Sequence, residues 1–237
     1  MGVMLRQALA LTTLSVACFG QIPLERPAAV GMPVWLKIPP DGVNSYYPFG
    51  WAVPADFGCK LVEVRRDRQI LPIIANLIEQ RGPGGFAGNS CSGRGNPPAR
   101  LPLHLLYRFD HPGIYEVRYT PNNGKVTRTQ VWTDWTPIEV QPSSPEARAR
   151  WLTEMRAKAP TAEKELLSDF LPNIAGFPDR QSLELLEPYL YHPSQAVRRY
   201  TAAALMYWPE AERKAEATRL LQEKGPNEAI TRILGVR

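Results

Sequence analysis

The uneven distribution of proline divides this chain of 237 residues into two parts that are expected to differ in secondary structure. Most of the 24 prolines lie before residue 145, and proline removes a backbone hydrogen-bond donor and breaks helices. Short strands and turns are therefore expected in that part. The pattern changes at Ser143-Ser144-Pro145, where a serine cap and an early proline are typical of a helix start. The sequence thus predicts a β-rich half followed by a helical half.

The C-terminal half has the periodicity of short helices, separated by breaks that contain proline or glycine. Short helices joined by tight turns cannot bury their apolar faces singly, so we expect them to stack as a layered array. The predicted helices span residues 145–158, 162–172, 179–190, 194–207, 210–223 and 226–234.

Residues 183–205 resemble a HEAT repeat, in which a first helix ends in a polar-proline turn and a second carries the pattern V-R-x-x-A-x-x-A-L. These positions are occupied by Val197, Arg198, Thr201, Ala204 and Leu205. The resemblance implies an interaction scaffold in which Arg198 reaches the carbonyls of the turn or an acidic neighbour. His192 lies in that turn, and we interpret it as a turn residue rather than a metal ligand.

The N-terminal half contains short apolar segments separated by turn signals, at the spacing of an all-β sandwich. The clearest segment is 113–119, where alternation places Ile114, Glu116 and Arg118 on one face and Tyr115, Val117 and Tyr119 on the other. The other predicted strands are 34–38, 60–64, 103–109 and a final segment within 126–140.

Residues 109–119 also resemble the proline-glycine-x-tyrosine turn and strand of bacterial immunoglobulin-like domains. The resemblance implies that Gly113 makes the turn and that Tyr115 has a packing role. His111 is interpreted as a turn residue, because no nucleophile motif accompanies it. Together, these patterns predict two domains: an all-β immunoglobulin-like sandwich over residues 21–142 and an all-α HEAT-like helical array over residues 143–237.

The first 20 residues have the pattern of a secretory signal peptide, with an apolar run over residues 8–17 and small residues before Gln21. The run is too short to anchor the chain across a bilayer, and no later segment is apolar enough for a transmembrane helix. We expect cleavage after Gly20 and a secreted or periplasmic protein. An alternative is a lipid anchor on Cys18, because residues 15–18 loosely resemble a bacterial lipobox.

Cleavage would leave two cysteines, Cys59 and Cys91, and export makes a disulfide the default for such a pair. The bridge would close a loop of about 33 residues and contribute roughly 3 to 4 kcal/mol in the chain-entropy model. The two cysteines could instead form a metal site or supply a catalytic thiol, but neither a CxxC spacing nor a nearby histidine supports these functions. We therefore predict no metal and no cofactor.

Two groups of aromatic residues are candidate binding residues. Exposed rings can stack on sugars or anchor a protein partner, whereas buried rings would fill the core of the β-rich half. The residues are Tyr46, Tyr47, Phe49 and Trp51 in the first group, and Trp132 and Trp135 in the second.

The net charge of +5 is spread along the chain, so we expect no nucleic-acid partner. The one local cluster, Arg65, Arg66 and Arg68, is interpreted as the solvated end of a strand. No triad, HExxH or paired-carboxylate motif is recognisable, so no catalytic residue is predicted. The predicted function is an exported, non-catalytic binding or scaffold protein with a protein partner in the cell envelope. The alternatives are a glycan-binding module that uses the aromatic residues and a hydrolase with acids in a cleft between the domains.

Overall fold

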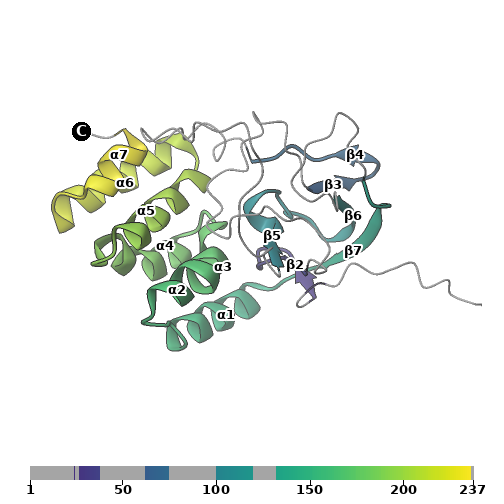
Figure 1. Ribbon diagram of the computed structural model, residues 1–237, viewed down its shortest axis with the longest axis horizontal. Coiled ribbons are helices and arrows are strands. Elements are labelled where there is room, and N and C mark those ends of the chain that lie inside the picture. Colours follow the sequence, from purple (N-terminus) through teal and green to yellow (C-terminus); the bar gives the residue numbers. More distant parts are fainter. Residues whose placement is uncertain (1–23, 25–26, 38–61, 75–99, 120–131, 236–237) are drawn as a thin grey trace, which may run out of the picture.

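The computed structural model describes residue 24 and residues 27–37, 62–74, 100–119 and 132–235. The strands gather on one side of the molecule, and the helices follow one another along the other side (Figure 1). The strands are β1 (Ala28–Ala29), β2 (Trp35–Lys37), β3 (Val62–Arg66), β4 (Gln69–Ile70), β5 (Arg100–Pro102), β6 (Gly113–Tyr119) and β7 (Thr136–Gln141). The helices are α1 (Pro145–Ala157), α2 (Glu163–Glu165), α3 (Leu171–Ala175), α4 (Arg180–Leu186), α5 (Gln195–Ala204), α6 (Glu210–Lys224) and α7 (Glu228–Leu234).

The predicted immunoglobulin-like sandwich is wrong. The described strands form one mixed five-stranded sheet in the order β1-β7-β6-β3-β4 and a separate two-stranded sheet of β2 and β5. β1 runs parallel to β7, whereas the other neighbours in the larger sheet are antiparallel. The inner face of this sheet packs on a single apolar core that includes Val64, Tyr107, Tyr115, Val117 and Ile138. No second sheet of the sandwich type covers it within the described residues.

The predicted strand over residues 103–109 is replaced by a 3₁₀ turn, η3 (Leu103–Leu105), and irregular chain. Residues 103 to 107 are all buried, so this segment has no solvent-facing side. The strand predicted over residues 113–119 is confirmed as β6 with the same bounds. Tyr115 is 2% exposed and its hydroxyl donates to the carbonyl of His111, which fits the packing role expected for it.

The helical half is confirmed, with element starts close to those predicted. The starts of α1, α4, α5 and α7 are capped by side chains that accept a backbone N–H, which are Ser144, Asp179, Ser194 and Asn227. Short non-α segments complete the helices: a π-helical turn, η4 (Leu166–Phe170), and the 3₁₀ turns η5 (Glu187–Tyr191) and η6 (Leu205–Tyr207). Arg198 donates to the carbonyls of His192 and Pro193 at 2.7 Å, so it reaches the turn as expected.

The sheet and the helices meet in a packed seam with its own polar contacts. The His104 imidazole, 4% exposed, lies 3.2 Å from the Val34 nitrogen through Nδ1 and 2.8 Å from the Pro172 carbonyl oxygen through Nε2. With the proton on Nε2, that nitrogen donates to Pro172 and Nδ1 accepts from Val34. The ring stacks on Phe177 with 5.5 Å between centroids. These contacts tie the residue before β2 to α3 and to the turn before α4.

Arg148 of α1 forms a second connection across the seam. Its guanidinium donates to the Gly31 carbonyl at 2.6 Å, to Asp179 at 3.0 Å and to the Ser182 hydroxyl at 2.8 Å. It also lies over the ring of Phe177, 4.2 Å from the centroid. Burial lowers the pKa of Arg148, while Asp179 acts in the opposite direction. Since arginine remains protonated in proteins, this is a buried cation with hydrogen-bond partners in both halves.

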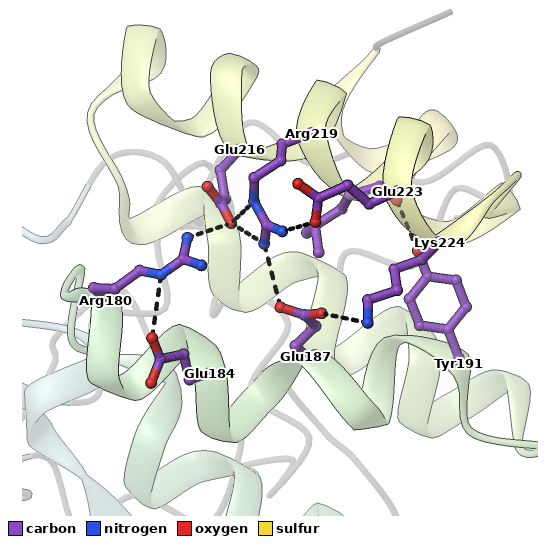
Figure 2. Close-up of polar contacts among 9 residues, drawn as sticks. Arg180, Glu184, Glu187, Tyr191, Glu216, Arg219, Glu223 and Lys224 are labelled. Carbon is purple, nitrogen blue, oxygen red and sulfur yellow. Dashed lines mark hydrogen bonds and ion pairs between the residues drawn. The ribbon is translucent and has the colours of Figure 1, made fainter.

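An ion-pair network holds α6 against α4 and η5 (Figure 2). Arg219 contacts three carboxylates: Glu216 at 2.5 Å, Glu187 at 3.2 Å and Glu223. The Glu216 carboxylate, which accepts its hydrogen bonds, raises the pKa of Arg219. Because the Arg219 side chain is only 27% exposed, these contacts are screened less than those of a fully solvated pair.

We expect Arg219→Met to lower the free energy of unfolding by about 1 kcal/mol at low salt, since several partly buried pairs are lost together. The loss should shrink in about 1 M salt, where the Debye length falls to about 3 Å. Urea denaturation at both salt concentrations measures this. Lys214→Met is the matched control, because Lys214 pairs with Glu210 alone among the ion pairs described and both side chains are more than half exposed. Equal effects of the two variants would contradict a cooperative network.

We also expect Gly176→Ala to weaken the seam. Gly176 has φ −76°, so alanine is not strained there, but its Cβ would lie 2.9 Å from His104 Cδ2 and 3.1 Å from the His104 carbonyl oxygen. Such overpacking costs about 1–3 kcal/mol, which chemical denaturation would detect. An unchanged denaturation midpoint would show that the seam accommodates the added methyl group without loss of stability.

Candidate binding surface

The outer face of the five-stranded sheet carries charged residues that pair across strands. Glu63 of β3 lies opposite Arg118 of β6, and Arg65 lies opposite Glu116. Arg118 donates twice to Glu63, at 2.8 and 2.6 Å. Arg65 donates to both oxygens of Glu116, at 2.6 and 2.8 Å, in a fork-to-fork pair. Within each ion pair the two opposite charges therefore neutralise each other on the middle strands of the sheet.

Trp132 and Trp135 lie against these arginines. The Arg118 guanidinium is 4.8 Å from the ring centroid of Trp132 and 4.4 Å from that of Trp135, and Arg65 is 4.2 Å from Trp135. All of these distances are within the range of cation–π attraction. We call these six side chains, Glu63, Arg65, Glu116, Arg118, Trp132 and Trp135, the Arg–Trp layer. It covers the outer side of the sheet, opposite the face that packs on the apolar core.

The segment before β7 is fixed to β6 by two hydrogen bonds. The Thr133 backbone N–H donates to the Tyr119 carbonyl at 2.9 Å, and the Tyr119 N–H donates to the Thr133 hydroxyl at 3.1 Å. Thr133 is thus held between the two tryptophans, at the end of β6. This anchoring fixes the backbone from which both rings reach the arginines.

Two exposed isoleucines flank the Arg–Trp layer. Ile70 of the edge strand β4 is opposite Arg65 and 52% exposed, and Ile114 of β6 is two residues before Glu116 and 56% exposed. Because side chains at i and i+2 share a face, both lie on the outer face with the layer. The surface therefore combines exposed aliphatic side chains with tryptophan and arginine, and the last two residue types are enriched in protein interfaces.

Other predicted site residues lie outside the described residues. These are Tyr46, Tyr47, Phe49 and Trp51, the cysteines Cys59 and Cys91, and the signal segment 1–20 with Cys18. The disulfide, the signal peptide and the first aromatic group stay predictions. Of the predicted binding residues, the structure describes Trp132 and Trp135, and both are half-buried.

The sequence interpretation missed the role of Arg65 and Arg118. Arg65 was grouped with Arg66 and Arg68 as a solvated strand end, and this is wrong for Arg65, whose side chain is 24% exposed and paired with Glu116. The available signal was the repeated Glu-x-Arg, at residues 63–65 and 116–118. In antiparallel strands two such triplets match each glutamate with an arginine.

Metal sites and membrane-spanning helices have no candidates in the described part of the chain. It contains no group of three or more His, Cys, Asp or Glu side chains that could hold a metal ion. Nor does any helix in that part have the length and apolar character needed to cross a membrane. Each described carboxyl with a displaced pKa, namely Glu116, Glu146 and Glu210, has it lowered rather than raised.

Comparison with known proteins gives no assignment: no family model, no curated protein and no solved structure matches this chain. The HEAT-like and immunoglobulin-like resemblances are therefore without support from any relative, and no repeat family is recognised in the helical half.

The Arg65–Glu116 pair predicts a specific pH dependence. The hydrogen bonds from Arg65 lower the pKa of Glu116 below its usual value, so ionised Glu116 stabilises the folded state at neutral pH. This contribution is present above the ordinary glutamate pKa of about 4.3 and is lost as the pH falls through the lower value in the folded protein. Glu116→Gln should therefore be less stable than the wild type at pH 7, and the difference should shrink as the pH falls below the ordinary glutamate pKa of about 4.3.

Denaturation curves across this pH range would measure the difference. Glu139→Gln, on the exposed face of the neighbouring strand β7, is the matched control. A stability difference at Glu116 that stays constant with pH would mean that its ionisation is not coupled to folding.

Proposed function

We propose that this chain is an exported, non-catalytic protein that binds a protein partner in the cell envelope through the outer face of its sheet. The observation that carries the proposal is the placement of Ile70 and Ile114, both more than half exposed, beside the Arg–Trp layer on one face. Export itself remains a prediction from residues 1–20.

The internal pairing of the layer favours protein docking. Burying an isolated charge is costly, but each arginine here already bonds a glutamate and contacts a tryptophan ring. A partner that covers the face therefore meets few groups that lose hydration without compensation. The two isoleucines supply apolar area that gains from burial, at about 25 cal/mol per Å².

The contacts of the tryptophans favour a protein over a glycan. Sugar binding needs an open ring face, whereas Trp135 has guanidinium groups from Arg65 and Arg118 over its ring and Trp132 has one from Arg118. The most exposed apolar side chains described on this surface are the aliphatic Ile70 and Ile114. The glycan alternative then depends on Tyr46 to Trp51, which lie outside the described residues.

The hydrolase alternative needs two acids that face each other between the two halves. Where the two halves meet in the described chain, the seam is filled by contacts such as His104 on Phe177 and the Trp35 indole bonded to Asn173. No carboxyl with a raised pKa accompanies it in that part of the chain. We therefore prefer the binding function.

The test compares capture by the full chain with capture by Ile70→Ser/Ile114→Ser from cell-envelope extracts. Both positions are exposed, so the double variant should keep the wild-type circular dichroism and denaturation midpoint. We expect a reproducible protein partner to be retained by the wild type and reduced about tenfold or more with the variant, as for interface hot spots.

Glu212→Gln, an exposed change on α6, is the control and should capture the partner like the wild type. Retention of the partner by the double variant at the wild-type level would refute docking on the sheet face. Retention of polysaccharide alone would replace the proposal with the glycan alternative.

A further inference from the structure

The helical half contains a groove that is separate from the sheet face. It has a volume of about 360 Å³, and its described lining residues run from Trp151 to Asn173. One wall is α1, and the other is formed by α2, the π-helical turn η4 and the start of α3. These elements lie side by side at one end of the helical stack (Figure 1). The volume is at the lower end of the range for ligand pockets, which suits a few side chains.

The base of the groove is apolar. Its apolar lining residues are Trp151, Met155, Pro160 and Phe170. Trp151 and Phe170 are 7% and 2% exposed, so they belong to the core of the helical half and form a firm base. Met155 is half-buried and has an adaptable side chain. An apolar side chain entering the groove would therefore exchange water for packed contacts.

The rim of the groove is acidic. Among the described lining residues, Glu154, Glu165 and Asp169 carry carboxylates and Lys158 carries an ammonium, a formal charge of −2. This sign is opposite to the +5 of the whole chain. Asp169 already accepts from Asn173, which leaves the exposed Glu154 and Glu165 as the carboxylates for a cation. Lys158 lies 3.9 Å from Glu154 and both side chains are more than 60% exposed, so the pair is weak and easily displaced.

The backbone and Asn173 position the carboxylate of Asp169. The π-helical turn, a geometry common at functional sites, carries both Asp169 and Phe170 into the groove. Asn173 is 3% exposed, and its amide nitrogen donates to the Asp169 carbonyl at 2.8 Å and to its carboxylate at 3.3 Å. The Asn173 amide oxygen in turn accepts from the Trp35 indole at 2.7 Å. The acidic rim is thus tied to the seam and held in place.

We propose that this groove docks a basic segment of a partner protein, with an arginine or lysine at the carboxylates of Glu154 and Glu165 and a neighbouring apolar side chain on the base. Charge complementarity selects the cation, and the apolar base selects a segment in which basic and apolar residues alternate or adjoin. The evidence for this site is independent of the sheet face. The groove proposal names the chemistry of the bound segment, whereas the sheet-face proposal names only a protein partner.

The test measures binding of a fluorescent six-residue peptide that alternates arginine and leucine, by anisotropy with the full chain at about 50 mM salt, where screening is modest. We expect the arginine–leucine peptide to bind, a peptide of alternating glutamate and leucine not to bind, and a peptide of alternating arginine and glycine to bind at least threefold more weakly. Glu154→Gln/Glu165→Gln should raise the Kd at least fivefold, because both carboxylates are exposed and lie on the rim.

Glu163→Gln is the matched control, since Glu163 is an exposed residue of α2 that does not line the groove, and it should change the Kd less than twofold. Equal binding of the acidic peptide, or equal losses in the control and the double variant, would overturn the proposal. Binding of free arginine as tight as that of the peptide would replace it with a small-molecule site. Ile70→Ser/Ile114→Ser should bind the peptide as tightly as the wild type. If the groove proposal fails, the sheet-face proposal is therefore unaffected and is decided by the capture experiment.

Discussion

The structure depends on one short stretch, Leu103–Tyr107, that is buried throughout and belongs to two cores. Leu103 and Leu106, three residues apart, both pack in the core of the sheet, as the three-residue period of a 3₁₀ turn allows. Leu105 instead packs among the helices. Between them, His104 bonds the backbone on both sides of the seam. A strand at this position would place Leu103 and Leu105 on the same face, and the two cores would lose their shared residue.

The sequence predicted the helical half well because its signals are local. A cap such as Ser144 or Ser194 and the proline breaks fix where each helix begins, whatever packs on it later. It predicted β6 for the same reason, since alternation from Ile114 to Tyr119 is a property of the strand alone. The sandwich prediction failed because alternation shows that a sheet has one apolar face but cannot show what packs on that face. Here the buried stretch Leu103–Tyr107 contributes Leu103, Leu106 and Tyr107 to the core on that face, and no second sheet of the sandwich type is described.

The candidate surface was predictable only in part. Trp132 and Trp135 were recognisable as large rings, but their partners Arg65 and Arg118 come from strands about 50 residues apart in sequence, and only the register brings them together. The groove was even harder to predict from the sequence. Its acidic rim combines α1 with a π-helical turn, and the propensity of residues 162–172 predicts a plain α-helix, in which Asp169 and Phe170 would be placed differently.

The seam also determines how the two surfaces can act together. Asn173 helps to position Asp169 in the groove and is itself bonded to Trp35 of β2, while Arg148 links α1 to Gly31 beside β1. The groove and the sheet face are therefore held by buried contacts rather than by a flexible linker, so their relative geometry is fixed. For a partner that reaches both surfaces, binding at the first raises the effective concentration at the second. Because the two surfaces are already fixed, no further entropy is lost in ordering the protein. This rigidity suits the proposed scaffold function, because two surfaces that each bind weakly can together select one partner when their geometry is fixed.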